Sequence, residues 1–151
     1  MDIHFRSFQE EDIDLYAQGQ EEAFSSSYPG ITITEQFKSE LRGHVLRSIG
    51  TNASVGITAM LKQQPIGFLM LGTQYLQDLP VGYIENIFVR EEYRKRGYGA
   101  KLLDAAEKHF RENGYRILQL DVSVHNHEAL SLYRAHGYAV GSYLMEKNIA
   151  L

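Results

Sequence analysis

The sequence predicts an α/β domain, of the α+β type, with elements in the order β-α-α-β-β-β-α-β-α-β-β around one mixed sheet of about seven strands. Three observations favour this class. Strand patterns at residues 54–61, 66–75 and 83–89 follow one another across short turns, which is typical of an antiparallel meander. A helical pattern then separates the strand at 83–89 from one at 117–122, which implies a right-handed crossover and parallel pairing. The length and composition suit one domain, residues 1–151.

The first third of the chain predicts one strand and two helices. Residues 2–8 alternate apolar and polar side chains, as a half-exposed strand does. Acidic residues at 10–12 suit the first turn of a helix that continues to about Phe24, where the stretch 25–30, rich in Ser with Pro and Gly, ends it. A second helix is expected over residues 34–49. These two helices form either a wall of the substrate site or a simple cover for the sheet.

The clearest helical pattern of the chain lies at residues 99–113. Its apolar side chains share one face and its charged side chains lie off that face, as in an amphipathic helix. Beyond it we expect a strand at 117–122, a helix from near Asn126 to just before Gly137, and a final short hairpin of residues 138–140 and 143–145 around Gly141-Ser142.

The bulk composition excludes several kinds of function. No apolar run is long enough for a transmembrane helix and the first residues do not resemble a signal peptide, so we expect no membrane partner and a cytoplasmic location. With no Cys, disulfides, thiolate nucleophiles and Cys metal sites are excluded. The formal net charge of −4 argues against nucleic acid as a partner. We expect no metal site, because the scattered histidines do not form a ligand set: His4, His44, His109 and His136.

The stretch of residues 83–100 carries the strongest functional signal. It begins as a buried strand, becomes basic at Arg94, Lys95 and Arg96, and passes through Gly97-Tyr98-Gly99 into a helix. The first N–H groups of a helix lack intrahelical partners and carry partial positive charge, and glycines let the backbone approach a ligand closely. This arrangement suits phosphate binding. The alternative is a solvated turn with a run of charges, because the Walker and full dinucleotide patterns are both absent.

A second stretch, residues 121–138, strengthens that interpretation. Together with the element order, the two stretches closely resemble the GNAT superfamily of acetyl-CoA-dependent N-acetyltransferases. Residues 94–99 match its pyrophosphate motif, (Q/R)-x-x-G-x-(G/A), and residues 126–138 match its later pattern, N-x-x-A-x-x-L-Y-x-x-x-G-(F/Y). The resemblance covers residues 83–138 strongly and the remainder only by element order. It implies one N-acetyltransferase domain, a sheet splayed at its two central strands, and acetyl-CoA as co-substrate.

The resemblance also implies a cofactor site made largely of backbone groups. Ile87, Phe88 and Val89 would bond the pantetheine arm as an added strand does, with the Phe88 side chain facing either the core or the acceptor. Asn126 would contact the cofactor where the central strands splay. The turn would cradle the pyrophosphate through backbone N–H groups and reach the outer phosphates through basic side chains; its residues are Arg94, Lys95, Arg96, Gly97, Tyr98, Gly99 and Ala100.

Two residues are the candidate catalytic groups, Tyr133 as general acid and Glu85 as general base. An amine attacks a thioester only when neutral, and with a pKa near 10.4 roughly one Lys-type amine in 10³ is neutral at pH 7, so some group must accept its proton. The expelled CoA thiolate then needs a proton. A phenol, with an ordinary pKa of about 10, can supply it, and the family places Tyr133 near the sulfur. The alternative for Tyr133 is simple packing on a helix face.

Glu85 is the favoured base because it lies two residues before Ile87, in a part of the strand where the family often has a carboxylate. An ordinary Glu is a weak base, so we expect either burial, which strengthens a carboxylate base, or a relay through water. Otherwise Glu85 binds the positive charge of the acceptor or only ends the strand. His125 and His127 are less favoured, because capping or solvent exposure explains histidines at a helix start.

The expected function is transfer of acetyl from acetyl-CoA to a primary amine by direct attack, without a covalent enzyme intermediate. Glu21, Glu22, Asp78 and Glu85 would draw a cationic acceptor: a polyamine, an amino sugar or a peptide amine. The alternative function is a non-catalytic acyl-CoA-binding regulatory module on the same fold. The short final hairpin leaves the acceptor site open, or completed by the second subunit of a homodimer.

Overall fold

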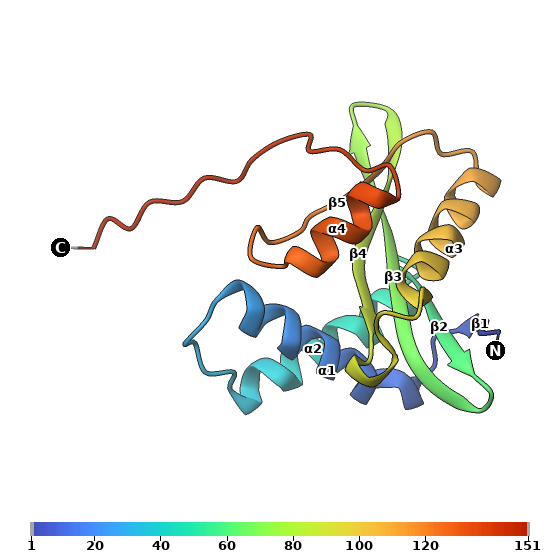
Figure 1. Ribbon diagram of the computed structural model, residues 1–151, viewed down its shortest axis with the longest axis horizontal. Helices are drawn as coiled ribbons and strands as arrows, with labels where there is room; N and C mark the ends of the chain where they lie inside the picture. The colour runs from blue at the N-terminus through green and yellow to red at the C-terminus, as the bar shows by residue number, and fades with distance from the viewer. Residues whose placement is uncertain (1, 151) are drawn as a thin grey trace.

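The computed structural model describes residues 2–150, which form one five-stranded sheet with helices on both faces (Figure 1). The strands lie side by side in the order β1-β2-β3-β4-β5. The elements along the chain are β1 (His4–Ser7), the short 3-10 helix η1 (Glu10–Asp12), α1 (Ile13–Ser27), α2 (Glu35–Gly50), β2 (Val55–Leu61), β3 (Gln64–Leu76), β4 (Leu79–Val89), the 3-10 helix η2 (Glu91–Tyr93), α3 (Tyr98–Glu112), β5 (Leu118–Leu120) and α4 (His127–Ala135).

The expected strand connections are confirmed. β1 to β4 pair antiparallel in succession, and β5 pairs parallel to β4 after the α3 crossover. This is a mixed α/β fold, as the sequence predicts. Thr34 is the N-cap of α2, and its side chain accepts from the Phe37 N–H at 3.2 Å, which explains why this helix begins where its capping pattern predicts.

The sheet separates two hydrophobic cores. On one face, Leu102, Leu103 and Phe110 of α3 pack with β3 and β4 residues that point toward them. On the other face, α1 and α2 cover an aromatic cluster that includes Tyr16 and Phe68. Alternate residues of β3 and β4 point to opposite faces of the sheet, which is why both strands are apolar almost throughout.

A buried carboxylate ties the first strand and helix to β2. Asp12 is 1% exposed and accepts hydrogen bonds from Arg6 at 2.6 and 2.9 Å, from the Gln9 N–H at 2.9 Å and from Thr58 Oγ1 at 2.8 Å. Burial alone would raise the pKa of Asp12, but these hydrogen bonds outweigh it and lower the pKa. The buried charge is therefore fully compensated, and it fixes the position of α1 on the sheet.

Several boundaries differ from the sequence expectation. β4 begins at Leu79 rather than at residue 83. Pro80 was expected in the turn, but it lies within the strand, opposite Tyr75. Proline is tolerated there because β5 pairs with β4 only from Gly82 onward, so the missing N–H has no ladder partner to lose. α1 continues to Ser27, past the expected end near Phe24. β5 is confined to residues 118–120, the part that pairs with β4.

The expected final hairpin at residues 138–140 and 143–145 is wrong. Residues beyond Tyr138 form no strand in the described chain, and they extend away from the body of the protein (Figure 1). A two-residue hairpin requires positive φ at its centre, but Gly141 does not adopt it and the chain is not reversed there. The sheet therefore has five strands, and the predicted count of about seven included these two.

None of the helices within residues 2–150 combines the length and the apolar character that crossing a membrane would require.

Candidate active site

A cavity of about 550 Å³ opens beside β4, beyond the point where β4 and β5 stop pairing. This volume is typical of small-molecule sites. Its walls come from α1, the end of β4, the turn before α3, and α4 with its N-cap. The lining residues are Gly19, Glu22, Ala23, Ser26, Ile87, Phe88, Val89, Arg94, Lys95, Gly97, Tyr98, Gly99, Ala100, Asn126, Glu128, Ala129, Leu132 and Tyr133. Of the residues predicted as catalytic or cofactor-binding, all but Arg96 and Glu85 line it, and of the further acidic residues expected to draw the acceptor, Glu22 lines it while Glu21 and Asp78 do not.

β4 supplies the first wall because its outer edge is unpaired beyond Ile84. β5 pairs with β4 only from Gly82 to Ile84, so the backbone of residues 87–89 has β3 on one side and no strand on the other. An extended ligand can bond such an edge as an added strand would. The Phe88 ring lies 5.7 Å from the Phe68 ring, in the core on the α1 face. Of the two orientations considered for Phe88, the structure shows the core-facing one.

The turn before α3 presents backbone N–H groups to the cavity, an arrangement that suits an anion. Lys95 and Gly97 have φ of 59° and 82°, in the left-handed region. Gly97 is the N-cap of α3, no side chain caps this helix, and its first turn carries no acidic residue. The N–H groups of Tyr98, Gly99 and Ala100 therefore lack intrahelical partners at the positive end of the helix dipole, and all three residues line the cavity.

Arg94 joins three walls of the cavity. Its Nε donates to the Val89 carbonyl oxygen at 2.8 Å, and its Nη2 lies 2.5 Å from Glu22 Oε1 on α1. Its guanidinium also lies over the Phe88 ring, 5.5 Å from the ring centre. Arg94 thus already has an acidic partner, and an incoming phosphate would compete with Glu22 for it.

The two neighbouring basic residues point in different directions. Lys95 lines the cavity, and no carboxylate pairs with it among residues 2–150. Arg96 lies over the Tyr93 ring, 5.8 Å from its centre, and is not part of the lining. Lys95 is therefore the basic side chain of the turn best placed to meet a ligand without first leaving another partner.

α4 forms the wall opposite β4. Asn126 is its N-cap, and the side-chain oxygen of Asn126 accepts from the Ala129 N–H at 3.2 Å, which fixes the amide at the cavity surface. A Cβ at Gly99 would come within 2.9 Å of Leu132 Cδ2, so glycine lets the Leu132 side chain of α4 pack directly against α3. The glycine of one sequence motif and the leucine of the other are thus packed together.

Tyr133 lies in the α4 wall and is 7% exposed. Burial raises the pKa of Tyr133 to about 12, so its phenol stays protonated throughout the neutral range. Its ring meets the Tyr138 ring edge to face at 5.9 Å, which fixes its orientation. Tyr133 therefore carries a phenolic proton throughout the neutral range, on a ring whose orientation is fixed.

Glu85 lies outside the cavity lining, and its position results from a β-bulge. The β3–β4 register shifts so that Met70 pairs with Asn86 and Leu71 with Ile84, which leaves Glu85 as the extra residue. The Glu85 carboxylate accepts from Ser54 Oγ, which lies 2.9 and 3.0 Å from its two oxygens. Glu85 is exposed, so the burial expected for a base is absent and the water relay is the remaining form of that hypothesis.

Of the two roles considered for the first two helices, a wall of the site or a simple cover for the sheet, the structure shows α1 as a wall of the cavity. Gly19, Glu22, Ala23 and Ser26 line it, so α1 is more than a cover for the sheet. A Cβ at Gly19 would come within 2.9 Å of the Phe68 and Phe88 rings, so glycine permits α1 to lie close to the sheet here. A glycine inside a helical pattern was the available signal, since it commonly marks close packing.

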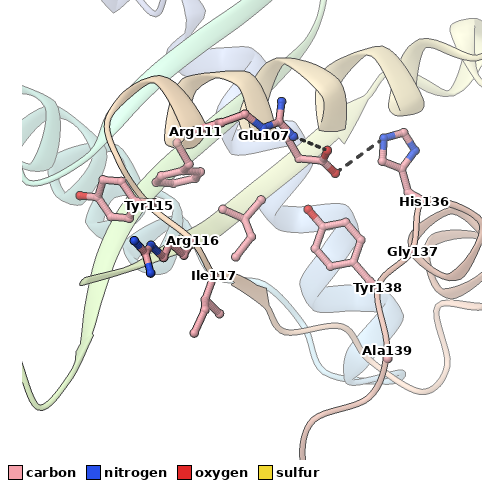
Figure 2. Close-up of a pocket in the computed structure, with 11 residues that line it drawn as sticks. Glu107, Arg111, Tyr115, Arg116, Ile117, His136, Gly137, Tyr138 and Ala139 are labelled. Atoms are coloured by element: carbon pink, nitrogen blue, oxygen red, sulfur yellow. Dashed lines mark ion pairs between the residues drawn. The ribbon is translucent and has the colours of Figure 1, made fainter. Parts of the chain in front are cut away.

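His136 is less isolated than the sequence suggests. Its Nε2 lies 2.9 Å from Asp104 Oδ1 and 3.8 Å from Glu107 Oε1, and Figure 2 shows the Glu107 contact joining α3 to the end of α4. These three side chains bring one ligand atom each within 4.8 Å of one another. They lie outside the lining of the large cavity, and holding α4 against α3 accounts for their arrangement. His125 and His127 do not line the cavity either.

Two curated N-acetyltransferases match part of the chain. One, an uncharacterized N-acetyltransferase of Methanocaldococcus jannaschii, is 31% identical over 50% of this chain and 34% of its own length. The other, an uncharacterized N-acetyltransferase of Bacillus subtilis, is 38% identical over 36% of this chain and 37% of its own length. The chain thus spans about a third of the length of these curated relatives.

Solved structures resemble nearly the whole chain. A GCN5-related N-acetyltransferase from Ralstonia eutropha superposes with a TM-score of 0.81 at 21% identity, covering 99% of this chain and 100% of the other. A predicted acetyltransferase from Clostridium acetobutylicum, solved with acetyl-CoA, gives 0.77 at 18% identity, covering 98% and 97%. The aminoglycoside N-acetyltransferase AAC(6')-Iy, solved with CoA, gives 0.73 at 18% identity, covering 97% and 94%. These identities show a shared fold.

The family assignment comes from the sequence itself. The model of the acetyltransferase (GNAT) family matches residues 14–138, which is well over half of the chain and includes every cavity wall. The fold agrees with this match. The chain belongs to the acetyltransferase (GNAT) family.

Proposed function

We propose that this protein is an N-acetyltransferase that moves acetyl from acetyl-CoA to a primary amine. The observation that carries the proposal is the 550 Å³ cavity, which joins an uncapped helix N-terminus, an unpaired strand edge and a buried phenol. Each suits one part of acetyl-CoA: pyrophosphate, pantetheine arm and thioester, in that order. The family members solved with acetyl-CoA and CoA support this co-substrate.

The cofactor would lie along the cavity from the α3 N-terminus to Tyr133. The N–H groups of residues 97–100 would bind the pyrophosphate, with Lys95 nearest the outer phosphates. The free edge of residues 87–89 would pair with the amides of the pantetheine arm. Asn126 would contact the same arm from the opposite wall, since its amide is held there by the α4 cap.

The reaction would proceed by direct attack of a neutral amine on the thioester carbonyl. The C–N bond forms, the tetrahedral intermediate collapses, and the C–S bond breaks to release CoA thiolate. Tyr133 would protonate that thiolate. Its phenol is protonated at neutral pH, and the burial that raises its pKa to about 12 also makes it a weaker acid than an exposed phenol. The phenolate left behind regains a proton from solvent, which balances the proton that the attacking amine loses on forming the amide.

The proton of the incoming amine would leave on the α1 face of the sheet. Glu85 and Ser54 form a polar pair there, and Gln20 of α1 donates to Asn86 on the adjacent strand position. Because Glu85 does not line the cavity, it would accept the proton through water rather than directly. Its negative charge would also favour a cationic acceptor.

The acceptor would be a small molecule or peptide with a primary amine. The expected location is the cytoplasm, where acetyl-CoA is available. Relatives of the same fold include aminoglycoside acetyltransferases and a ribosomal-protein-alanine N-acetyltransferase. We propose a polyamine, an amino sugar or a peptide amine as the acceptor class.

The test is CoA release from acetyl-CoA, followed with a thiol reagent across a panel of those amines. The protein has no Cys, so it contributes no thiol background. Turnover with one amine class would support the proposal and identify the acceptor. Tight acetyl-CoA binding without turnover on any amine would favour a non-catalytic acyl-CoA-binding module, and failure to bind acetyl-CoA would overturn the cofactor site itself.

A further inference from the structure

Three side chains of the kind that bind metal ions meet between α3 and the end of α4. They are Asp104, Glu107 and His136, and each offers one ligand atom within 4.8 Å of the others. His136 Nε2 lies 2.9 Å from Asp104 Oδ1 and 3.8 Å from Glu107 Oε1. An imidazole nitrogen and two carboxylate oxygens are ligands that zinc takes in proteins.

Both helices hold these side chains in place without an ion. The two acids are three residues apart in α3, so they lie on the same face of that helix. His136 is the C-cap of α4, and the Tyr138 N–H donates to the Tyr133 carbonyl oxygen at 3.0 Å. This bond spans Gly137, which has φ 90°, as in a Schellman motif. The ligands therefore need little ordering when an ion binds, which favours affinity.

The separations between the ligand atoms suit a tetrahedral zinc ion. Zinc binds nitrogen and oxygen at about 2.0–2.2 Å, which places neighbouring ligand atoms about 3.3 Å apart. The two separations from His136 Nε2, 2.9 Å to Asp104 and 3.8 Å to Glu107, lie on either side of that value. Small rotations of the side chains would therefore bring all three atoms to one ion.

A buried hydroxyl beside these ligands indicates a missing partner. The Tyr138 hydroxyl is buried and has no hydrogen-bond partner within residues 2–150, and Figure 2 shows it on the side of Glu107. Burial and then the Glu107 charge raise the pKa of Tyr138, so the phenol keeps its proton and can donate it to a hydrogen bond. A buried polar group without a partner commonly faces a water or an ion.

A hollow of about 360 Å³ gives an ion and its water access to the ligands. Glu107, His136 and Tyr138 all line it. Glu107 directs its two oxygens differently: Oε2 lies 3.9 Å from Arg111 Nη2, whereas Oε1 faces His136 (Figure 2). One oxygen is thus held by Arg111 while the other remains directed at the place where an ion would lie, as outer partners of metal ligands commonly arrange.

We propose that Asp104, Glu107 and His136 bind one zinc ion that fastens the end of α4 to α3. Three protein ligands leave one tetrahedral position for water, which the Tyr138 hydroxyl is placed to meet. α4 carries Tyr133, and α3 begins at the turn that lines the large cavity, so the ion would fix two cavity walls relative to each other. Without it, the contact with Asp104, which is 69% exposed, holds the helices more weakly.

The first test is zinc binding by the full-length, untagged protein after a chelator has removed its metal. Calorimetry should give one ion per chain. The unfolding temperature should rise by about 5–10 °C at roughly a hundred times the dissociation constant. Mg²⁺ at the same concentration should have little effect, because it prefers oxygen ligands and keeps its water. Co²⁺ should compete with zinc and show the visible absorption of a tetrahedral site.

Variants locate the ion. His136→Asn and Glu107→Gln should each weaken zinc binding at least about a hundredfold, since loss of an outer partner alone costs about 10- to 100-fold. α3 supplies a matched control for each. His109→Asn removes another histidine, and Glu112→Gln removes another acid that lies 3.9 Å from a basic side chain one turn away. Both controls should bind zinc as the wild type does.

Hydrogen exchange tests whether the ion fastens α4. Zinc should slow amide exchange in α4 of the wild type but not of His136→Asn. The proposal is overturned by a protein that binds no zinc, by binding that survives both ligand variants, or by controls that lose as much affinity as those variants. Zinc binding that leaves exchange in α4 unchanged would show an adventitious ion only. None of these measurements depends on acetyl transfer, so their outcome is separate from that of the proposed function.

Discussion

The two halves of the candidate active site are built differently. The proposed cofactor half is made of backbone from one stretch of the chain: the turn at residues 94–100 presents N–H groups, and residues 87–89 present a strand edge. The proposed acceptor half is made of side chains from separate parts of the chain. Ser54 binds Glu85 there, and Gln20 binds Asn86, across sequence separations of 31 and 66 residues.

This difference explains why one half is easier to recognise than the other. A backbone site depends on backbone conformation, and a particular conformation favours particular residues within the same stretch of sequence. Examples are Gly97, which has φ 82°, and Gly99, which packs against Leu132. A side-chain site depends on which residues the fold brings together. Substitutions should therefore act differently in the two halves: in the cofactor half on acetyl-CoA affinity, in the acceptor half on amine turnover.

The largest expected effect is from Tyr133→Phe, at the junction of the two halves. Loss of the phenolic proton should lower kcat by about 10² to 10⁴-fold. Acetyl-CoA affinity should change less than about threefold, because the ring remains and no protein group hydrogen-bonds the hydroxyl among the residues described. Steady-state kinetics and calorimetric binding separate the two quantities. Because the pKa of Tyr133 is about 12, no loss of activity from its ionisation is expected below about pH 11.

Tyr138→Phe is the control for that experiment. Its hydroxyl is buried without a hydrogen-bond partner, and its ring packs edge to face on Tyr133. Removing an unsatisfied hydroxyl should leave kcat unchanged and raise the free energy of unfolding by up to about 1 kcal/mol. Equal losses of kcat in the two variants, or equal losses of turnover and cofactor affinity in Tyr133→Phe, would contradict an acid role for Tyr133.

The next largest effect is expected from Glu85→Gln in the acceptor half. It should lower kcat/KM for the amine by about 10 to 10²-fold, with the greatest loss below the pH optimum, where neutral amine is scarce. Acetyl-CoA affinity should be unchanged, because Glu85 does not line the cavity. The measurement is a full pH–rate profile. An unaltered profile would remove Glu85 as base, whereas a rise in KM alone would identify it as a binding group for the cationic acceptor.

Ser54→Ala is a milder test of the same pair. It removes the donor that holds the Glu85 carboxylate at 2.9 and 3.0 Å without changing the charge. A loss of a few-fold is expected, since a hydrogen bond to a charged group contributes about 1.5 to 3 kcal/mol only where it is well shielded from water. A larger loss than that of Glu85→Gln would mean that Ser54 itself contacts the acceptor.

The same difference determines which parts of the fold and of the site the sequence predicts. The meander, the crossover helix and the cofactor turn follow from local patterns: alternation at 66–75, amphipathic spacing at 99–113, and glycines at 97 and 99. Each pattern is set by residues close in sequence. Local patterns left open whether α1 is a wall of the site or a cover, because nothing local marks Glu22 as the partner of Arg94.

The wrong hairpin and the exposure of Glu85 have physical reasons of the same kind. The final hairpin was inferred from apolar residues around Gly141-Ser142, but alternation shows only that a segment can pair, not with what. Glu85 was expected to be buried or relayed through water, and the bulge that exposes it arises from the β3–β4 register. The pairing partner and the register of a strand depend on segments that are far apart in the sequence. The pattern within one segment therefore does not predict them.

Gly97→Ala should affect the cofactor half alone. Gly97 lies at φ 82° with no atom near the position a Cβ would take, so alanine there costs about 1–2 kcal/mol of backbone strain without a clash. Relief of that strain would turn the N–H groups of the turn away from the pyrophosphate and weaken acetyl-CoA binding about tenfold. Isothermal titration and thermal unfolding measure the two effects.

Gly114→Ala is the matched control. Gly114 has the same φ of 82° and the same open surroundings, but it lies beyond the other end of α3. Both variants should lose similar stability, and only Gly97→Ala should lose cofactor affinity. If both variants bind acetyl-CoA as the wild type does, the turn does not hold the pyrophosphate, and the cofactor half must be placed elsewhere.

The smallest effect is expected from Glu22→Gln, which frees Arg94 from its present partner. Glu22 is 45% exposed, so the ion pair is weak, and its loss should tighten acetyl-CoA binding only about two- to fivefold. The gain should shrink as ionic strength rises, because exposed charges are screened over about 8 Å at 0.15 M salt. Glu21→Gln makes the same change in net charge but removes a partner of Lys38 instead, so its affinity should not change. An equal gain in both variants would show a general effect of charge, and Arg94 would then have no specific part in phosphate binding.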